Sequence, residues 1–212
     1  MFALSLVLSQ VPFALPGWAG QIRLLAFGDS LTEGYGLPKD QGLVPRLQDW
    51  LRQRGHDVLV VNGGKSGDTT AGGVLRIDAA LASAQPDAVL VELGGNDILG
   101  NLGWSGAQGN LDQILAKAGQ ANRPVLLVGI ADPRAHARQQ RGWAAIWPRL
   151  AEKHGALLFP DLYAPLTARP AEEWAGLLQQ DGVHASAKGI GLIVDALGPS
   201  VETLLARIEA AQ

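Results

Sequence analysis

Five short apolar runs, separated by stretches with helical spacing, constrain the fold more than any other feature of the chain. The runs cover residues 22–27, 58–61, 88–93, 125–130 and 156–159. They are apolar at nearly every position rather than at alternate ones, which is typical of strands covered on both faces. Strands that alternate with helices pair in parallel through crossover connections. The sequence therefore predicts a three-layer α/β/α domain with a parallel sheet of about five strands.

The segments between these runs place apolar residues three or four positions apart, as helices do. We expect helices over residues 43–54, 72–84, 111–121 and 142–154, and a last one over 188–210 that breaks near Gly198 and Pro199. Within 72–84 the core candidates are Leu75, Ile77 and Leu81. Ligands of such sheets bind beyond the carboxyl ends of the strands. Polar motifs that directly follow a strand are therefore the first candidates for a site.

The first 20 residues carry no charged side chain, and Gly17 and Ala19 are small residues placed like a cleavage site. This pattern predicts a signal peptide over residues 1–20 and a periplasmic or secreted protein. The alternative is an apolar N-terminal extension in a cytoplasmic protein. Polar residues and Pro12 interrupt the stretch, so we expect no stable membrane anchor. Residues 21–212 would then form a single domain.

Charge and composition exclude several classes of function. The chain of 212 residues has a formal net charge of −3 and no cysteine. A mildly acidic chain without a basic patch is not suited to bind nucleic acid, and we expect no such partner. The absence of cysteine excludes disulfides, zinc–thiolate sites and a thiol nucleophile. No HExxH motif or other clustered ligand set occurs, so we expect neither a metal nor an organic cofactor.

Four short polar motifs stand out. They are Gly28-Asp29-Ser30-Leu31, Ser66-Gly67-Asp68-Thr69, Gly94-Gly95-Asn96-Asp97 and Asp181-Gly182-Val183-His184. The first and third directly follow predicted strands, the second lies in the loop after the strand at 58–61, and the fourth precedes the final helix. Three of the four therefore lie where the sheet is expected to bind its ligand.

The residue types in these motifs point to acyl transfer. A serine hydroxyl needs a base to become a nucleophile, and a histidine oriented by a carboxylate supplies one. Asp181 and His184 are three residues apart, so a tight turn brings both side chains to one side. The oxyanion of the tetrahedral intermediate also needs hydrogen-bond donors. The candidates are the backbone N–H groups of Ser30 and Gly67, whose missing Cβ allows close approach to a ligand, and the Asn96 amide.

In this order, the four motifs resemble the conserved blocks of the SGNH (GDSL-type) hydrolases. The stretches LLAFGDSLTEGYG, VVNGGKSGDTTAGGVLR, VLVELGGNDIL and QQDGVHASAKG carry the likeness, which is to the bacterial multifunctional thioesterase, arylesterase and lysophospholipase group. The resemblance implies the flavodoxin-like SGNH hydrolase fold. It implies Ser30, Asp181 and His184 as the catalytic residues, and Ser30, Gly67 and Asn96 as the oxyanion hole.

The function implied is that of a serine esterase acting on small to medium acyl esters, with thioesters and lysophospholipids as further substrates. A carbohydrate O-deacetylase of the same family and a non-catalytic binding protein on the same fold remain alternatives. The loops after Asn96 and after the strand at 125–130 border the substrate, and both depart from the family pattern. Ile98, Leu99 and Arg134 in these loops are the candidates for substrate contact.

Overall fold

The computed structural model describes residues 20–131 and 137–209, and its centre is a sheet of five parallel strands in the order β2-β1-β3-β4-β5. The elements in chain order are β1 (Ile22–Gly28), α1 (Ser30–Glu33), α2 (Leu43–Arg52), β2 (Val58–Gly64), α3 (Thr70–Ala84), β3 (Ala88–Glu92), α4 (Gly95–Leu99), α5 (Trp104–Ala118), η1 (Gln120–Asn122), β4 (Val125–Val128), α6 (Ala137–His154), β5 (Leu157–Phe159), α7 (Ala164–Thr167), η2 (Ala171–Gly176) and α8 (Ala187–Glu209). The predicted three-layer α/β/α fold is confirmed. The expected signal peptide or extension falls, except for Gly20, outside the described residues.

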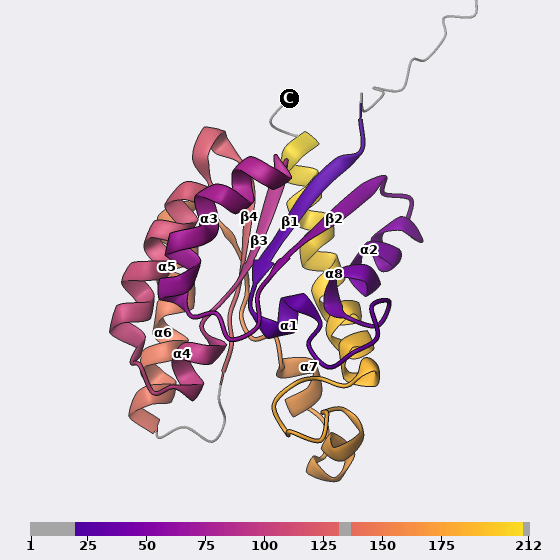
Figure 1. Ribbon diagram of the computed structural model, residues 1–212, viewed down its shortest axis with the longest axis vertical. Coiled ribbons are helices and arrows are strands. Elements are labelled where there is room, and N and C mark those ends of the chain that lie inside the picture. Colours follow the sequence, from indigo (N-terminus) through magenta and orange to yellow (C-terminus); the bar gives the residue numbers. More distant parts are fainter. Residues whose placement is uncertain (1–19, 132–136, 210–212) are drawn as a thin grey trace, which may run out of the picture.

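Helices cover both faces of the sheet. Figure 1 shows α3, α5 and α6 on one side and α2 and α8 on the other. Successive residues of a strand point to opposite faces, so β1 contributes Leu24 and Ala26 to one core and Leu25 and Phe27 to the other. This arrangement explains why the strands are continuously apolar in the sequence.

The strand register brings the carboxyl ends of the central strands level. Gly28 at the end of β1 pairs with Gly64 of β2 on one side and with Glu92 of β3 on the other. In Figure 1 these ends converge around α1 at the lower edge of the sheet, with α4 and α7 nearby. Loops that leave these strands therefore start from one place, which is where the polar motifs lie.

The break expected in the last helix is wrong, because α8 runs through Pro199 without interruption. Proline removes a helical hydrogen bond, but Leu197 and Val201 on either side are fully buried and keep the helix docked on the sheet. Gly198 has a packing role. A Cβ there would lie 2.6 Å from three ring atoms of Trp50 on α2, whose Nε1 donates to Asp195 at 3.1 Å. The missing side chain thus makes room for the indole.

Leu75 is 87% exposed, so its place among the core candidates is wrong. Its position lies about 200° around the helix from the buried Ile77 at the usual helical spacing, and it therefore faces away from the sheet.

The stretch Ala187–Ile208 of α8 is long and apolar enough to cross a membrane by length and composition, but 50% of it is buried within the structure. It packs in the sheet core with α2.

We predict that Gly198→Ala lowers the free energy of unfolding by about 1–3 kcal/mol, because the rigid Trp50 ring must move to accommodate the added methyl group. The better helix propensity of alanine opposes this by only about 1 kcal/mol. Gly191→Ala is the matched control in the same helix, since a Cβ there meets nothing within 4 Å. In urea unfolding, the free energy of unfolding of Gly191→Ala should equal or exceed that of the wild type. Equal stability of the two variants would contradict the packing argument.

Candidate active site

Ser30 begins the short helix α1 directly after β1, and it is 8% exposed. The residue before it shapes the turn, because the Oδ1 atom of Asp29 accepts a hydrogen bond from the backbone N–H of Leu31 at 3.0 Å. Asp29 is buried at the N-terminus of α1. The strand-to-helix turn thus holds Ser30 at the carboxyl edge of the sheet.

The Asp181–His184 segment forms a tight turn closed by an antiparallel bridge between Leu178 and Ala185. The Oδ1 atom of Asp181 accepts from the backbone N–H groups of Val183 at 2.9 Å and His184 at 3.0 Å. Its Oδ2 atom lies 2.6 Å from Nδ1 of His184. Burial acts to raise the pKa of Asp181, but the hydrogen bonds from the His184 ring and the two N–H groups lower it overall. The aspartate is therefore held as a carboxylate beside the imidazole.

The other ring nitrogen of His184 reaches the serine. Nε2 lies 2.8 Å from Oγ of Ser30, although 154 positions separate the two residues. The structure thus joins Ser30, His184 and Asp181 in one chain of hydrogen bonds. The ring of Tyr35 lies beside the imidazole, with its centroid 4.8 Å away and the planes inclined at 39°. Sequence reasoning missed Tyr35, which no motif singled out.

The three residues expected to bind an oxyanion border one pocket. Gly67 has a φ of +76°, a conformation that glycine adopts without strain, and a Cβ there would meet nothing within 4 Å. Its backbone conformation, rather than close contact with other protein atoms, is what calls for glycine here. The Nδ2 atom of Asn96, on α4, donates to the Asp68 carbonyl at 2.8 Å and lies 3.2 Å from Oδ2 of Asp29. The loop before Gly67 is held by Glu33, whose Oε2 atom accepts from the N–H of Ser66 at 2.8 Å.

Behind the serine turn lies a fully buried carboxyl group, that of Glu92 at the end of β3. Its Oε2 atom accepts from the Thr32 hydroxyl at 2.7 Å, while Oε1 has no partner among the described residues. Burial, and then the charge of nearby Asp29, raises the pKa of Glu92 well above its usual value. Burial likewise raises the pKa of Asp29 to about 6. Sequence analysis overlooked Glu92, although a lone carboxyl group in the apolar run 88–93 was the available signal.

Ser30, Asp181 and His184 line a cavity of about 570 Å³. Its walls are mainly apolar and aromatic, and they include Leu31, Ile98, Leu99, Ile130, Leu166, Leu177, Leu178, Tyr163 and Trp174. Ile98 and Leu99 thus lie where substrate contact was expected, and Arg134 lies outside the described residues. Sequence analysis did not foresee the wall formed by α7, η2 and the segment after them. No group of three His, Asp or Glu side chains that could hold a metal occurs in residues 20–131 and 137–209.

We predict that Glu92→Gln flattens the pH dependence of stability. Because the folded pKa of Glu92 lies above its unfolded value, the native state keeps the Glu92 proton between about pH 4.3 and the folded pKa, where the unfolded chain has lost it. The wild type should therefore lose stability over that range, by up to about 1.4 kcal/mol per pH unit for each extra proton. Urea unfolding between about pH 5 and 8 measures this slope. Glu152→Gln, which alters an exposed carboxyl group on α6, is the control; an unchanged slope in Glu92→Gln would contradict the assignment.

Comparison with known proteins places this geometry in a family. The GDSL-like lipase/acylhydrolase family matches residues 26–191. Esterase TesA of Pseudomonas aeruginosa is 33% identical over 183 residues, which cover 86% of this chain and 89% of that protein. The thioesterase 1/protease 1/lysophospholipase L1 of Escherichia coli is 33% identical over 183 residues, or 86% and 84% of the two chains.

A solved structure agrees with the sequence comparison. The SGNH-hydrolase family esterase AlinE4 superposes with a TM-score of 0.71 at 40% identity, and the match covers 88% of this chain and 98% of that one. The match of sequence blocks, sheet topology and family thus extends over most of the chain. The chain therefore belongs to the GDSL-like lipase/acylhydrolase family, that is, to the SGNH hydrolases.

Proposed function

We propose that this protein hydrolyses esters of small to medium acyl groups through an acyl-enzyme on Ser30. The observation that carries the proposal is the hydrogen-bonded chain from Ser30 Oγ through His184 to Asp181, 2.8 Å and 2.6 Å long, at the edge of an apolar pocket. The esterase and thioesterase names of the relatives support the same class of reaction. Thioesters and lysophospholipids are further substrates of the same chemistry.

In the first step, Oγ of Ser30 attacks the carbonyl carbon while Nε2 of His184 takes the hydroxyl proton. The tetrahedral intermediate collapses as the C–O bond to the leaving group breaks, and His184 returns the proton to the departing alcohol. A water molecule then attacks the acyl-enzyme with His184 again as the base, which frees the acid and restores Ser30. Asp181 stabilises the imidazolium in both steps and fixes the ring orientation.

Oxyanion stabilisation is assigned to the backbone N–H groups of Ser30 and Gly67 and to the side-chain amide of Asn96. These groups share the pocket with the nucleophile and come from the ends of three different strands. Preorganised donors of this kind stabilise the charge that develops in the transition state. Because Asn96 Nδ2 also lies 3.2 Å from Asp29 Oδ2, substrate binding would replace this longer contact with one to the oxyanion.

The pocket favours an acyl chain over a sugar. Apolar and aromatic side chains dominate its walls, and burial of methylene groups against them contributes about 0.8 kcal/mol each. A carbohydrate would instead need several polar partners for its hydroxyl groups. The apolar walls therefore support an esterase of lipid-like or aryl acyl compounds rather than an O-deacetylase of carbohydrates.

We expect Ser30→Ala to lose at least about 10⁴-fold in kcat on a p-nitrophenyl ester, because the remaining groups only bind and polarise the carbonyl. A fluorophosphonate probe should label the wild type at Ser30, as mass spectrometry of the peptide would show, and should not label the variant. The non-catalytic alternative requires an unlabelled wild type. Near-normal hydrolysis by Ser30→Ala would overturn the mechanism.

We expect Trp174→Ala to lower kcat/KM about tenfold for the longer esters of an acyl chain-length series and to leave acetyl esters nearly unchanged, because the longer chains lose an apolar wall. Trp174→Phe is the matched control. It keeps an aromatic wall, smaller than the indole, and removes the Nε1 donor, which bonds the Arg169 carbonyl at 3.0 Å. A uniform loss across the series in Trp174→Ala would show that the side chain supports the fold rather than the acyl group.

A further inference from the structure

Arg76, on α3, lies outside the pocket lining but contacts two of the three segments on which the proposed oxyanion hole is built, those that carry Ser30 and Gly67. Its Nε atom bonds Oδ2 of Asp68 at 2.5 Å, Nη1 bonds the Gly63 carbonyl at 2.7 Å, and Nη2 bonds the Gly28 carbonyl at 2.6 Å. The guanidinium carbon lies 3.9 Å from the centroid of the Phe27 ring. Each of its three nitrogens therefore holds an acceptor at the carboxyl edge of the sheet.

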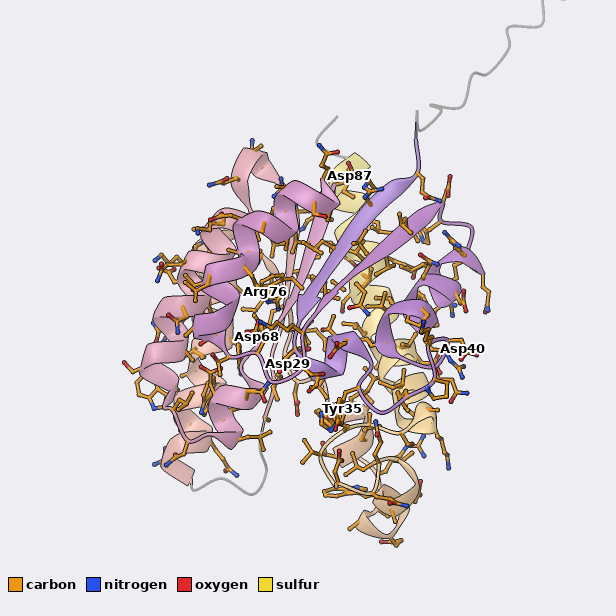
Figure 2. All side chains as sticks on the ribbon, viewed as in Figure 1. Asp29, Tyr35, Asp40, Asp68, Arg76 and Asp87 are labelled. Carbon is orange, nitrogen blue, oxygen red and sulfur yellow. The ribbon has the colours of Figure 1, made fainter. Side chains whose placement is uncertain are left out.

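These acceptors are close in sequence to the oxyanion donors. Gly28 is two residues before Ser30, and Asp68 directly follows Gly67. The third donor is tied in as well, because Asn96 Nδ2 donates to the Asp68 carbonyl at 2.8 Å. Figure 2 shows Arg76, Asp68 and Asp29 one after another toward the lower edge of the sheet. A shift of Arg76 would therefore move the Ser30 and Gly67 N–H groups through one or two peptide units. It would move the Asn96 amide through the hydrogen bond to Asp68.

Arg76 also neutralises a charge beside the site. Asp68 is only 6% exposed, and its carboxylate is paired with Arg76. Asp29, a second buried carboxyl group, lies close enough for the charge of Asp68 to raise its pKa. Without a cation, the negative charge of Asp68 would lie near the point where the oxyanion forms and would oppose its development.

Resting on the proposed function, we propose that Arg76 is the positioning residue of the oxyanion hole, which fixes the Ser30, Gly67 and Asn96 donors from behind without touching the substrate. The planar guanidinium suits this role because its donors are fixed in a fork that can hold three acceptors at once. A lysine keeps the charge but cannot reproduce that geometry. The role thus predicts a loss of transition-state binding rather than of substrate binding.

The test compares Arg76→Lys and Arg76→Gln with a matched control. Arg123→Lys is suitable because Arg123 also bonds two backbone carbonyls, those of Pro86 at 2.9 Å and Ala118 at 2.8 Å, but beside the amino end of β4. For each variant we would measure kcat and KM on a p-nitrophenyl ester, the rate of fluorophosphonate labelling, and the melting temperature. The phosphonate oxygen occupies the oxyanion position, so its rate reports on the donors directly.

We expect both Arg76 variants to lose about 10²-fold in kcat, the cost of a small displacement of catalytic groups, with KM within about twofold of the wild type. Labelling should slow in parallel. Asn96→Ala should cost about 10²–10³-fold in the wild type and clearly less in the Arg76→Lys background, because the donors no longer act together. Arg123→Lys should change only the melting temperature.

The outcomes separate this inference from the proposed function. Wild-type protein without Ser30-dependent hydrolysis would overturn the proposed function and the role of Arg76 together. If the wild type is active but Arg76→Lys has the same kcat and labelling rate as Arg123→Lys, the role of Arg76 alone is overturned. The same follows if Asn96→Ala lowers kcat by the same factor in the wild type and in the Arg76→Lys background. If Arg76→Gln does not fold, Arg76→Lys carries the same comparison, because it retains the charge that pairs with Asp68.

Discussion

The in-register parallel pairing of β1 with β2 and β3 is the constraint on which the site depends. Because Gly28 lies level with Gly64 and Glu92, the loops that carry Ser30, Gly67 and Asn96 all leave the sheet at the same height. A parallel sheet of this kind needs apolar cover on both faces, and the two cores supply it. The packing of the two apolar cores therefore determines how close Ser30 lies to Gly67 and Asn96, the groups proposed to stabilise an oxyanion.

Much of this arrangement was predictable from the sequence. Continuous apolar runs predicted all five strands, and the four polar motifs, three after strands and one before the last helix, predicted that Ser30, Asp181 and His184 lie together. What failed depended on tertiary packing. Helix α5 begins at Trp104 rather than near 111, and α8 continues through Pro199, since local propensity is a weak guide where burial decides. Tyr35, Arg76 and Glu92 were missed because their importance arises from contacts with distant residues, which no spacing rule encodes.

Beneath the pocket lies a concentration of buried acidic groups: Asp29, Asp68, Glu92 and Asp97 are each at most 6% exposed. Burying carboxyl groups is costly unless they are hydrogen-bonded or paired. Here Asp68 is paired with Arg76, and the other three accept from backbone or hydroxyl donors, as Asp97 does from the N–H and hydroxyl of Thr70 at 2.8 Å and 2.6 Å. Polar groups in this layer fix the geometry of the turns at some expense of stability, which is a common compromise around functional sites.

The apolar wall formed by α7 and η2 belongs to a stretch between β5 and the Asp181–His184 turn. Figure 1 shows this stretch standing below the three layers rather than within them. Leu166 and Leu177 anchor this stretch in the core, and Leu178 bridges Ala185 beside the imidazole, but the residues between Leu166 and Leu177 are largely exposed and can change without altering the strands. Related proteins could therefore differ in the substrate they accept while keeping the same reaction, and residues 168–176, which are largely exposed, are the part that could be exchanged. Under the proposed function, part of the wall that would contact the acyl group thus lies on a segment separate from the strands and turns that hold Ser30 and His184.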